Sequence, residues 1–145
     1  MSKKIYLASP FFNDNELSIY FQVIKALRDK GYKVYVPQEH EIENAWDYPN
    51  YVWGQKVFDE DVKALKSCDV VMVLNFGMYS DSGTAWEAGF AFGIGKNCIQ
   101  VLCGDENTTY SLMMINGTTK VVHLDNVANW EEESAWQPLN KIIQK

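Results

Sequence analysis

The sequence has little that could hold a metal ion, build a disulfide framework or cross a membrane. Its 145 residues include three cysteines and two histidines, with no Cys-x-x-Cys pair, so no dedicated zinc site is expected. The odd set Cys68, Cys98 and Cys103 lies in apolar surroundings, which predicts reduced core thiols in a cytoplasmic protein. No apolar run approaches the roughly 20 residues of a membrane span, and the N-terminal residues pass into a strand pattern without the form of a signal peptide.

Positive charge is also scarce. Thirteen Lys and Arg stand against 19 Asp and Glu, giving a net charge of -6, so the basic face of a nucleic-acid binder is not expected. The segment SPFFNDNE (residues 9–16) has no Lys or Arg to compensate a phosphate. Gly89, Gly93 and Gly95 follow neither the dinucleotide nor the Walker pattern, so they are interpreted as helix-packing and helix-ending residues.

Strand and helix signals alternate along the chain. Apolar runs predict strands over residues 4–8, 33–36, 70–74, 99–102 and 120–122, and helical spacing predicts helices over 15–30, 51–67, 83–95 and 130–143. Residues 38–50 show no clear periodicity and are expected to form a loop. This alternation predicts a single α/β domain over residues 1–145, with a five-stranded parallel sheet and helices on both faces in the flavodoxin-like (Rossmann-like) manner.

Ligands of such sheets bind at the carboxyl ends of the strands, beside the topological switch point. This rule places residues 9–14 and 76–87 around one crevice. Phe11 and Phe12 follow the first strand directly and could stack on a planar ligand there. Trp46, Tyr48 and Trp53 are nearby in sequence and could stack on it too, but a place in the core or a lid is slightly favoured for the two Trp residues.

Three carboxylates are the main chemical signal, and each also has a structural explanation. Asp61 could be a solvated helix residue, Asp81 could be an N-cap, and Thr84-x-x-Glu87 matches a capping box. However, Asp81-Ser82-Gly83 already supplies helix-start signals. Glu87 lies in the largely apolar run AWEAGFAFGIG, where partial desolvation is costly unless the carboxylate has a partner or a function.

A partly buried Glu near two Asp residues suits glycosyl transfer. One carboxylate attacks an anomeric carbon with oxocarbenium character while an acid protonates the leaving group. Asp61, on a helix facing the crevice, is the residue we expect to move the proton. Asp81 lies at the start of a helix, where the dipole favours its anion, and is expected to hold sugar hydroxyls.

Several motifs together resemble the nucleoside 2-deoxyribosyltransferases over nearly the whole chain. They are Tyr6-x-Ala8-Ser9-Pro10-Phe11-Phe12, Asp61-Val62 followed by Cys68-Asp69-Val70-Val71, the block DSGTAWEAG (residues 81–89), Gly95-Lys96, and Ser111-Leu112-Met113. The resemblance implies a flavodoxin-like enzyme without a cofactor. Its substrates would be 2′-deoxyribonucleosides and free nucleobases, between which 2-deoxyribose passes through a covalent deoxyribosyl-glutamate.

The resemblance also implies roles for individual residues. Glu87 would be the nucleophile, and Tyr6 would hydrogen-bond and orient it. Asp61 and Asp81 would handle the base proton and the sugar hydroxyls. The remaining substrate contacts would come from Ser9, Phe11, Phe12 and Gly83.

Three positions depart from the family pattern. Ser111 stands where members often have an Asn that reaches the sugar 5′-hydroxyl in a neighbouring subunit's site, and related deoxynucleotide N-hydrolases have Ser there. With Met113, this position implies a homo-oligomer, a dimer or a dimer-based hexamer. Glu41 stands where a neutral Gln is common, which affects base preference, and the chain ends in Lys145 where some members place a Tyr carboxylate in the site.

Two other functions remain open from the sequence. An N-glycoside hydrolase would pass the intermediate to water, and its nucleotide-hydrolysing version would need phosphate contacts. A non-enzymatic nucleotide-binding module would lack the ordered set Tyr6, Asp61, Asp81 and Glu87. We therefore expect the transferase first.

Overall fold

The protein is built on a five-stranded parallel sheet. The structure, a computed structural model, describes residues 2–132 and 142–143. The strand order is β2-β1-β3-β4-β5, and every neighbouring pair is parallel. The strands are β1 (Lys4–Ala8), β2 (Lys33–Tyr35), β3 (Val70–Asn75), β4 (Asn97–Leu102) and β5 (Lys120–His123). The predicted flavodoxin-like fold class is confirmed.

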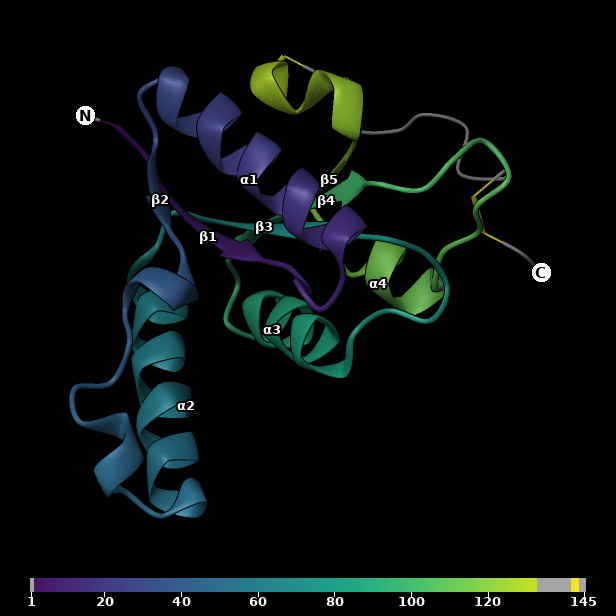
Figure 1. Cartoon of the computed structure of the whole chain (residues 1–145). Coiled ribbons are helices and arrows are strands. Elements are labelled where there is room, and N and C mark those ends of the chain that lie inside the picture. The colour runs from purple at the N-terminus through teal and green to yellow at the C-terminus, as the bar shows by residue number, and fades with distance from the viewer. Residues whose placement is uncertain (1, 133–141, 144–145) are drawn as a thin grey trace.

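Helices cover both faces of this sheet (Figure 1). They are α1 (Asp14–Asp29), α2 (Asn50–Ser67), α3 (Ser82–Gly93) and the short α4 (Leu112–Asn116), with 3₁₀ turns η1 (Pro37–Glu39), η2 (Ala45–Asp47) and η3 (Leu124–Asn129). The α1 helix and η3 lie on one face, whereas α2, α3 and α4 lie on the other. No helix in the described part of the chain combines the length and apolarity of a membrane span.

Alternating side chains of β1 contribute to two separate hydrophobic cores, one on each face of the sheet. On β1, Ile5 and Leu7 pack with the buried face of α1, while Tyr6 and Ala8 pack with residues of α2 and α3. All six residues of β3 are buried, as expected for a strand covered on both sides. Tyr6 therefore belongs to the core shared with the helices that carry Asp61 and Glu87.

Local signals explain where α1 begins and ends. The Asn13 side chain caps the helix by accepting a hydrogen bond from the Glu16 backbone N–H. Gly31, just past the C-cap, adopts a φ of 90°, a left-handed conformation that glycine reaches without the steric cost of a side chain.

The structure differs from the sequence prediction in two segments. Residues 38–50, expected as a plain loop, include parts of η1 and η2, and α4 is too short to produce a helical period in the sequence. The helix predicted for 130–143 falls mostly on residues 133–141, which lie outside the described part of the chain. At its end, Ile143 forms an isolated parallel bridge with Tyr110.

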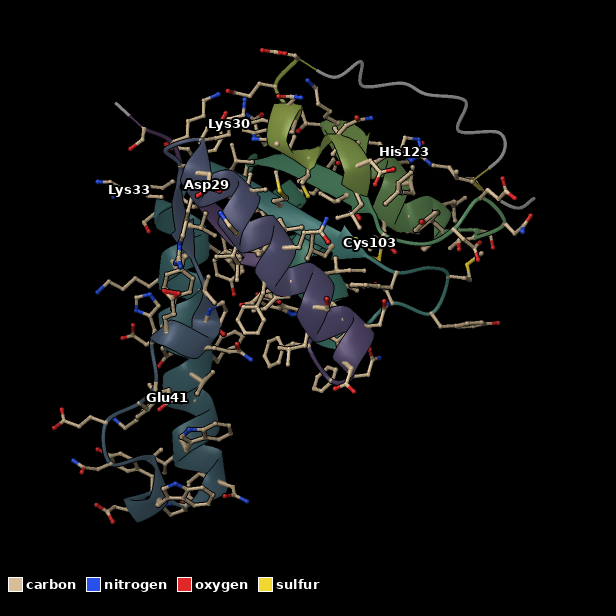
Figure 2. All side chains as sticks on the ribbon, turned by 45° about the horizontal axis from the view of Figure 1, so that its top comes forward. Asp29, Lys30, Lys33, Glu41, Cys103 and His123 are labelled. Atoms are coloured by element: carbon tan, nitrogen blue, oxygen red, sulfur yellow. The ribbon has the colours of Figure 1, made fainter. Side chains whose placement is uncertain are left out.

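The segment after β2 projects with α2 away from the sheet (Figure 1). Figure 2 shows Glu41 on this segment, beside α2. The segment after β2 and helix α2 form a wall at the carboxyl end of β1.

Candidate active site

A cavity of about 840 Å³ lies at the carboxyl end of β1. Its walls come from the loop after β1, the segment after β2, and helices α2 and α3. The lining residues are Leu7, Ser9, Phe11, Phe12, Pro37, Gln38, His40, Glu41, Ile42, Ala45, Trp46, Tyr48, Asn50, Trp53, Val57, Glu60, Asp61, Asp81 and Glu87. This position, beside the switch point between β1 and β3, is where the fold class places its ligands.

Glu87 reaches the cavity from α3 and is held by a strand. The Tyr6 hydroxyl, from the middle of β1, donates a hydrogen bond to Glu87 Oε2. Burial and the nearby Glu87 charge raise the pKa of Tyr6 far above its ordinary value, so the hydroxyl keeps its proton and acts as a donor. With Oε2 occupied, Oε1 is the oxygen of Glu87 left for chemistry.

Glu87 has an elevated proton affinity. Its pKa is raised from 4.5 to about 7: burial is the main cause, the Tyr6 hydrogen bond opposes it, and the negative charges of Asp61 and Asp81 add to it. Three carboxylates around one cavity therefore hold a proton near neutral pH.

Asp81, not Thr84, caps α3. Asp81 Oδ2 accepts hydrogen bonds from the Thr84 backbone N–H at 2.9 Å and from Thr84 Oγ1 at 3.0 Å. Glu87 lies more than a turn beyond this cap and bonds Tyr6 instead of the helix start. The capping-box interpretation of Thr84-x-x-Glu87 is thus wrong, while Asp81 serves as the N-cap and also lines the cavity.

Asp61 faces the cavity from α2. Its carboxylate Oδ1 accepts a hydrogen bond of 3.4 Å from the Tyr35 hydroxyl at the end of β2. Burial raises the pKa of Asp61, the Tyr35 hydrogen bond lowers it, and the charges of Glu60 and His40 act in opposite directions. The balance leaves Asp61 a weaker acid than an exposed aspartate.

Aromatic rings form much of the cavity wall. Phe11 and Phe12 stack with ring centroids 5.7 Å apart, and Phe12 is 76 % exposed. Trp46, Tyr48 and Trp53 also line the cavity, and Trp46 is fully exposed, so it belongs to no core. A planar, uncharged heterocycle fits such walls.

The cavity is acidic. Five carboxylates line it, and His40 is its one basic side chain; no Lys or Arg belongs to the lining given by the described residues. Within those residues no cluster of three or more His, Cys, Asp or Glu has the arrangement of a metal site.

Some expected substrate-binding residues lie elsewhere in this single chain. Ser9 and Glu41 line the cavity, and Gly83 sits in the first turn of α3 beside Asp81 Oδ2. Ser111, the N-cap of α4, and Met113, 76 % exposed on α4, do not line it.

Two residues of the site were missed by the sequence reasoning. The Tyr35 ring stacks on Tyr6 with centroids 5.3 Å apart, and His40 stacks on the other side of Tyr35 at 4.3 Å. Tyr35 could have been identified from its pairing with Tyr6 in the neighbouring parallel strand, but this pairing is known only once the register of the sheet is known.

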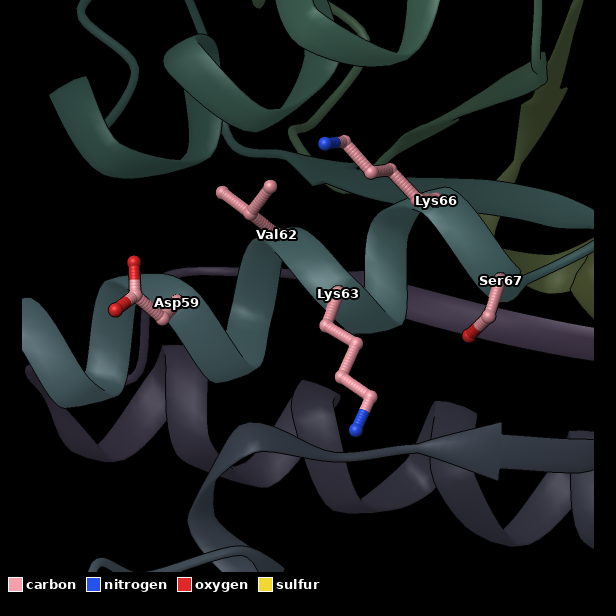
Figure 3. A pocket seen from close by; sticks show the side chains of 5 residues that line it. All are labelled: Asp59, Val62, Lys63, Lys66 and Ser67. Atoms are coloured by element: carbon pink, nitrogen blue, oxygen red, sulfur yellow. The ribbon is translucent and has the colours of Figure 1, made fainter.

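A second hollow, of about 530 Å³, lies on α2 away from these groups (Figure 3). It is open, its five lining residues all come from one helix, and it shares none of them with the larger cavity. Figure 3 shows Lys63 and Lys66 extending to opposite sides of that helix. We therefore place the site in the larger cavity.

The fold and this cavity define a flavodoxin-like α/β protein with an acidic, aromatic-walled site, and comparisons with known proteins identify the family. The family model described as "Nucleoside 2-deoxyribosyltransferase" matches residues 5–142. The chain belongs to the nucleoside 2-deoxyribosyltransferase family of enzymes, which acts on nucleosides and nucleobases.

Individual relatives agree with this assignment. A nucleoside deoxyribosyltransferase of Lactobacillus leichmannii is 24% identical over 110 residues, covering 69% of this chain and 70% of that protein. The structure of a 2-deoxyribosyltransferase from Bacillus psychrosaccharolyticus superposes with a TM-score of 0.78 at 28% identity, covering 97% of both chains. A CMP N-glycosidase of Clostridium botulinum, with a TM-score of 0.57 at 21% identity over 90% of this chain and 100% of that one, shares the fold.

The raised pKa of Glu87 predicts a pH-dependent effect on stability. Between pH 4.5 and 7 the folded protein keeps a proton that the unfolded chain has lost, so the free energy of unfolding falls as pH rises and levels off above pH 7. Glu87→Gln removes this ionisation while keeping an oxygen for Tyr6. We expect it to be more stable than the wild type at pH 8 by about 1–3 kcal/mol, with a smaller difference at pH 5.

Urea unfolding at the two pH values measures this difference. Glu106→Gln, on an exposed loop, is the matched control. It should change the free energy of unfolding only slightly, and by the same amount at pH 5 and pH 8. A Glu87→Gln variant no more stable than the wild type at pH 8 would show that Glu87 ionises normally.

Proposed function

We propose that this protein transfers 2-deoxyribose between purine and pyrimidine bases through a covalent deoxyribosyl ester of Glu87. The observation that carries the proposal is the Glu87 carboxylate, lining an aromatic cavity with one oxygen held by Tyr6 and a second acid, Asp61, in the same wall. Family membership supports the sugar and the base as the groups exchanged.

In the first half-reaction, Glu87 Oε1 attacks C1′ of a bound deoxyribonucleoside. The C1′–N bond breaks with its electron pair on the base nitrogen, and Asp61 gives that nitrogen a proton. A base that leaves protonated avoids anionic charge, which speeds such cleavages by about 10²–10⁴-fold. The products are the free base and a deoxyribosyl–Glu87 ester.

The second half-reaction reverses these roles. A nitrogen of the incoming base attacks C1′, its proton passes to Asp61, and the Glu87 carboxylate leaves. Asp81 keeps Oδ2 on the N-terminal turn of α3, so its Oδ1 is available to accept a sugar hydroxyl. Phe11 and Phe12 supply rings against which either base can stack.

The first test is base exchange in the Glu87→Ala variant. Deoxyinosine with free adenine should give hypoxanthine and deoxyadenosine in the wild type, followed by liquid chromatography. We expect Glu87→Ala to lose more than about 10³-fold of this activity, because the covalent route is closed. Glu106→Ala, a matched surface variant, should retain it. Exchange at the wild-type rate in Glu87→Ala would refute the proposal.

The same assay separates transfer from hydrolysis. A hydrolase would release hypoxanthine and free deoxyribose, whether or not adenine is present, and would form no new nucleoside. The fold shared with the CMP N-glycosidase makes this the alternative to measure.

We also propose that the substrates are free nucleosides rather than 5′-monophosphates. A 5′-phosphate of charge near -2 would enter a cavity lined by five carboxylates and no Lys or Arg among the described residues. We expect kcat/KM for deoxyadenosine to exceed that for its monophosphate by at least about 100-fold. A 5′-O-methyl nucleoside, bulky but neutral, is the control. Comparable turnover of the monophosphate would contradict the proposal and favour a nucleotide hydrolase.

Assembly into a homo-oligomer, at least a dimer, is a further part of the proposal. Phe58, Trp86, Phe92 and Ile94 leave large apolar areas exposed on α2, on α3 and just past its end, and the Trp86 ring stacks on Phe90 at 5.2 Å. Such a surface supports contact with a second copy. Ser111 and Met113, which do not line the cavity of their own chain, would then complete a neighbour's site.

Sedimentation at assay concentration tests this assembly. We expect a dimer or larger species, and expect Trp86→Glu to shift the protein toward monomers that lose exchange activity. Trp46→Glu, which changes an exposed Trp outside that surface, should leave the sedimentation coefficient unchanged. An active wild-type monomer would exclude a site completed by a neighbour.

We place this activity in the cytoplasm. Cys68, Cys98 and Cys103 are all free thiols, which is the usual state in a reducing compartment.

A further inference from the structure

Three aromatic rings form a continuous stack behind the carboxylates of the site. Tyr6 on β1 and Tyr35 on β2 are paired in register and lie 5.3 Å apart with an interplanar angle of 15°. His40, just after η1, lies 4.3 Å from Tyr35 at 10°. The sheet register fixes the two tyrosines relative to each other.

Each tyrosine of this stack donates its hydroxyl to a different carboxylate. Tyr6 bonds Glu87 of α3, and Tyr35 bonds Oδ1 of Asp61 of α2 at 3.4 Å. The second bond is long, as catalytic hydrogen bonds often are before substrate binds. Two parallel rings thus place two carboxylates from two helices against one cavity.

A hydrogen bond donated to one carboxylate oxygen determines which of the two oxygens carries the proton in the neutral acid. When Tyr35 donates to Oδ1 of Asp61, the proton of the neutral acid is favoured on Oδ2, because a protonated Oδ1 would face another donor. An acid for a leaving base needs such a fixed proton position, since proton transfer requires hydrogen-bond geometry.

We propose that Tyr35 is a positioning residue for Asp61, holding Oδ1 so that Oδ2 carries the transferable proton, and that His40 stacks on the outer side of the Tyr35 ring to keep it in place. This proposal rests on the proposed function, because it gives Asp61 the role of acid. Tyr35 would serve Asp61 as Tyr6 serves Glu87, because each tyrosine donates its hydroxyl to one carboxylate.

The groups around Asp61 set the expected direction of its titration. Tyr35 and His40 lower its pKa, Glu60 on the same helix raises it, and Glu87 of α3 and Tyr6 of β1 are electrostatically coupled to it. Loss of the Tyr35 hydroxyl removes a hydrogen bond to the anion, so the Asp61 pKa should rise further.

The experiment uses Tyr35→Phe, which keeps the ring and removes the hydroxyl. Carboxyl ¹³C NMR titration of Asp61 should show a higher pKa than in the wild type. Tyr32→Phe is the matched control, because the Tyr32 hydroxyl donates to Glu131 at the surface. Unchanged Asp61 titration in Tyr35→Phe would overturn the proposal.

Kinetics give the second readout. Tyr35→Phe should slow nucleosides with poor leaving bases by at least about tenfold, and those with an activated leaving group much less. His40→Ala removes the ring stacked on Tyr35 and should change the leaving-group dependence in the same direction as Tyr35→Phe. Equal slowing of both substrate classes by Tyr35→Phe would assign Tyr35 a merely structural role.

A third measurement needs no Tyr35 variant. In the wild type, the Tyr35 Cζ signal should titrate with the Asp61 carboxyl, and this inflection should vanish in Asp61→Asn. Its persistence there would contradict the contact. None of these titrations depends on turnover, so they test the contact between Tyr35 and Asp61 independently of the proposed function. Exchange at the wild-type rate in Glu87→Ala would refute the proposed function without changing the outcome of the titrations.

Discussion

The hydrogen bond between the Tyr6 hydroxyl and the Glu87 carboxylate joins strand β1 to helix α3. The site depends on this contact, because it fixes a partly buried carboxylate that opens to the cavity and is the proposed nucleophile. Asp81 caps the same helix at its start, so two of the three acidic groups are placed by how α3 begins and by what it packs against. A helix displaced by one residue would turn Glu87 away from Tyr6, since successive residues are 100° apart around a helix.

Burial gives the site its chemistry and also destabilises the fold. Burial is the main cause that raises the pKa of Glu87 to about 7, and it also raises that of Asp61, so the carboxylates of the site do not all ionise readily at neutral pH. A nucleophile and an acid are needed together for glycosyl transfer, and two identical exposed carboxylates would both be ionised. The tyrosine donors partly offset the cost of the buried charges, each on its own carboxylate.

Much of this arrangement follows from the sequence, and the remainder depends on contacts between distant segments. Continuously apolar β3 and the periodic α1 identify the sheet and its cover, and Glu87 stands out as a carboxylate in an apolar helix. The Tyr6–Tyr35 pairing could not be predicted, because the register of two parallel strands is set by the packed core rather than by either strand alone. The stacking of His40 depends on the 3₁₀ turn of residues 37–39, and α4 has too few residues for a period.

The most direct test of the account is a search for the covalent intermediate. A 2-fluoro-2-deoxy nucleoside should form the ester and release it slowly, since fluorine disfavours the oxocarbenium-like transition states of both steps. Mass spectrometry of a tryptic digest should then show one fluorodeoxyribosyl group on the peptide of residues 67–96, located at Glu87 by fragmentation and removed by an acceptor base. Release of the base without any label, or a label on another residue, would contradict a mechanism through Glu87.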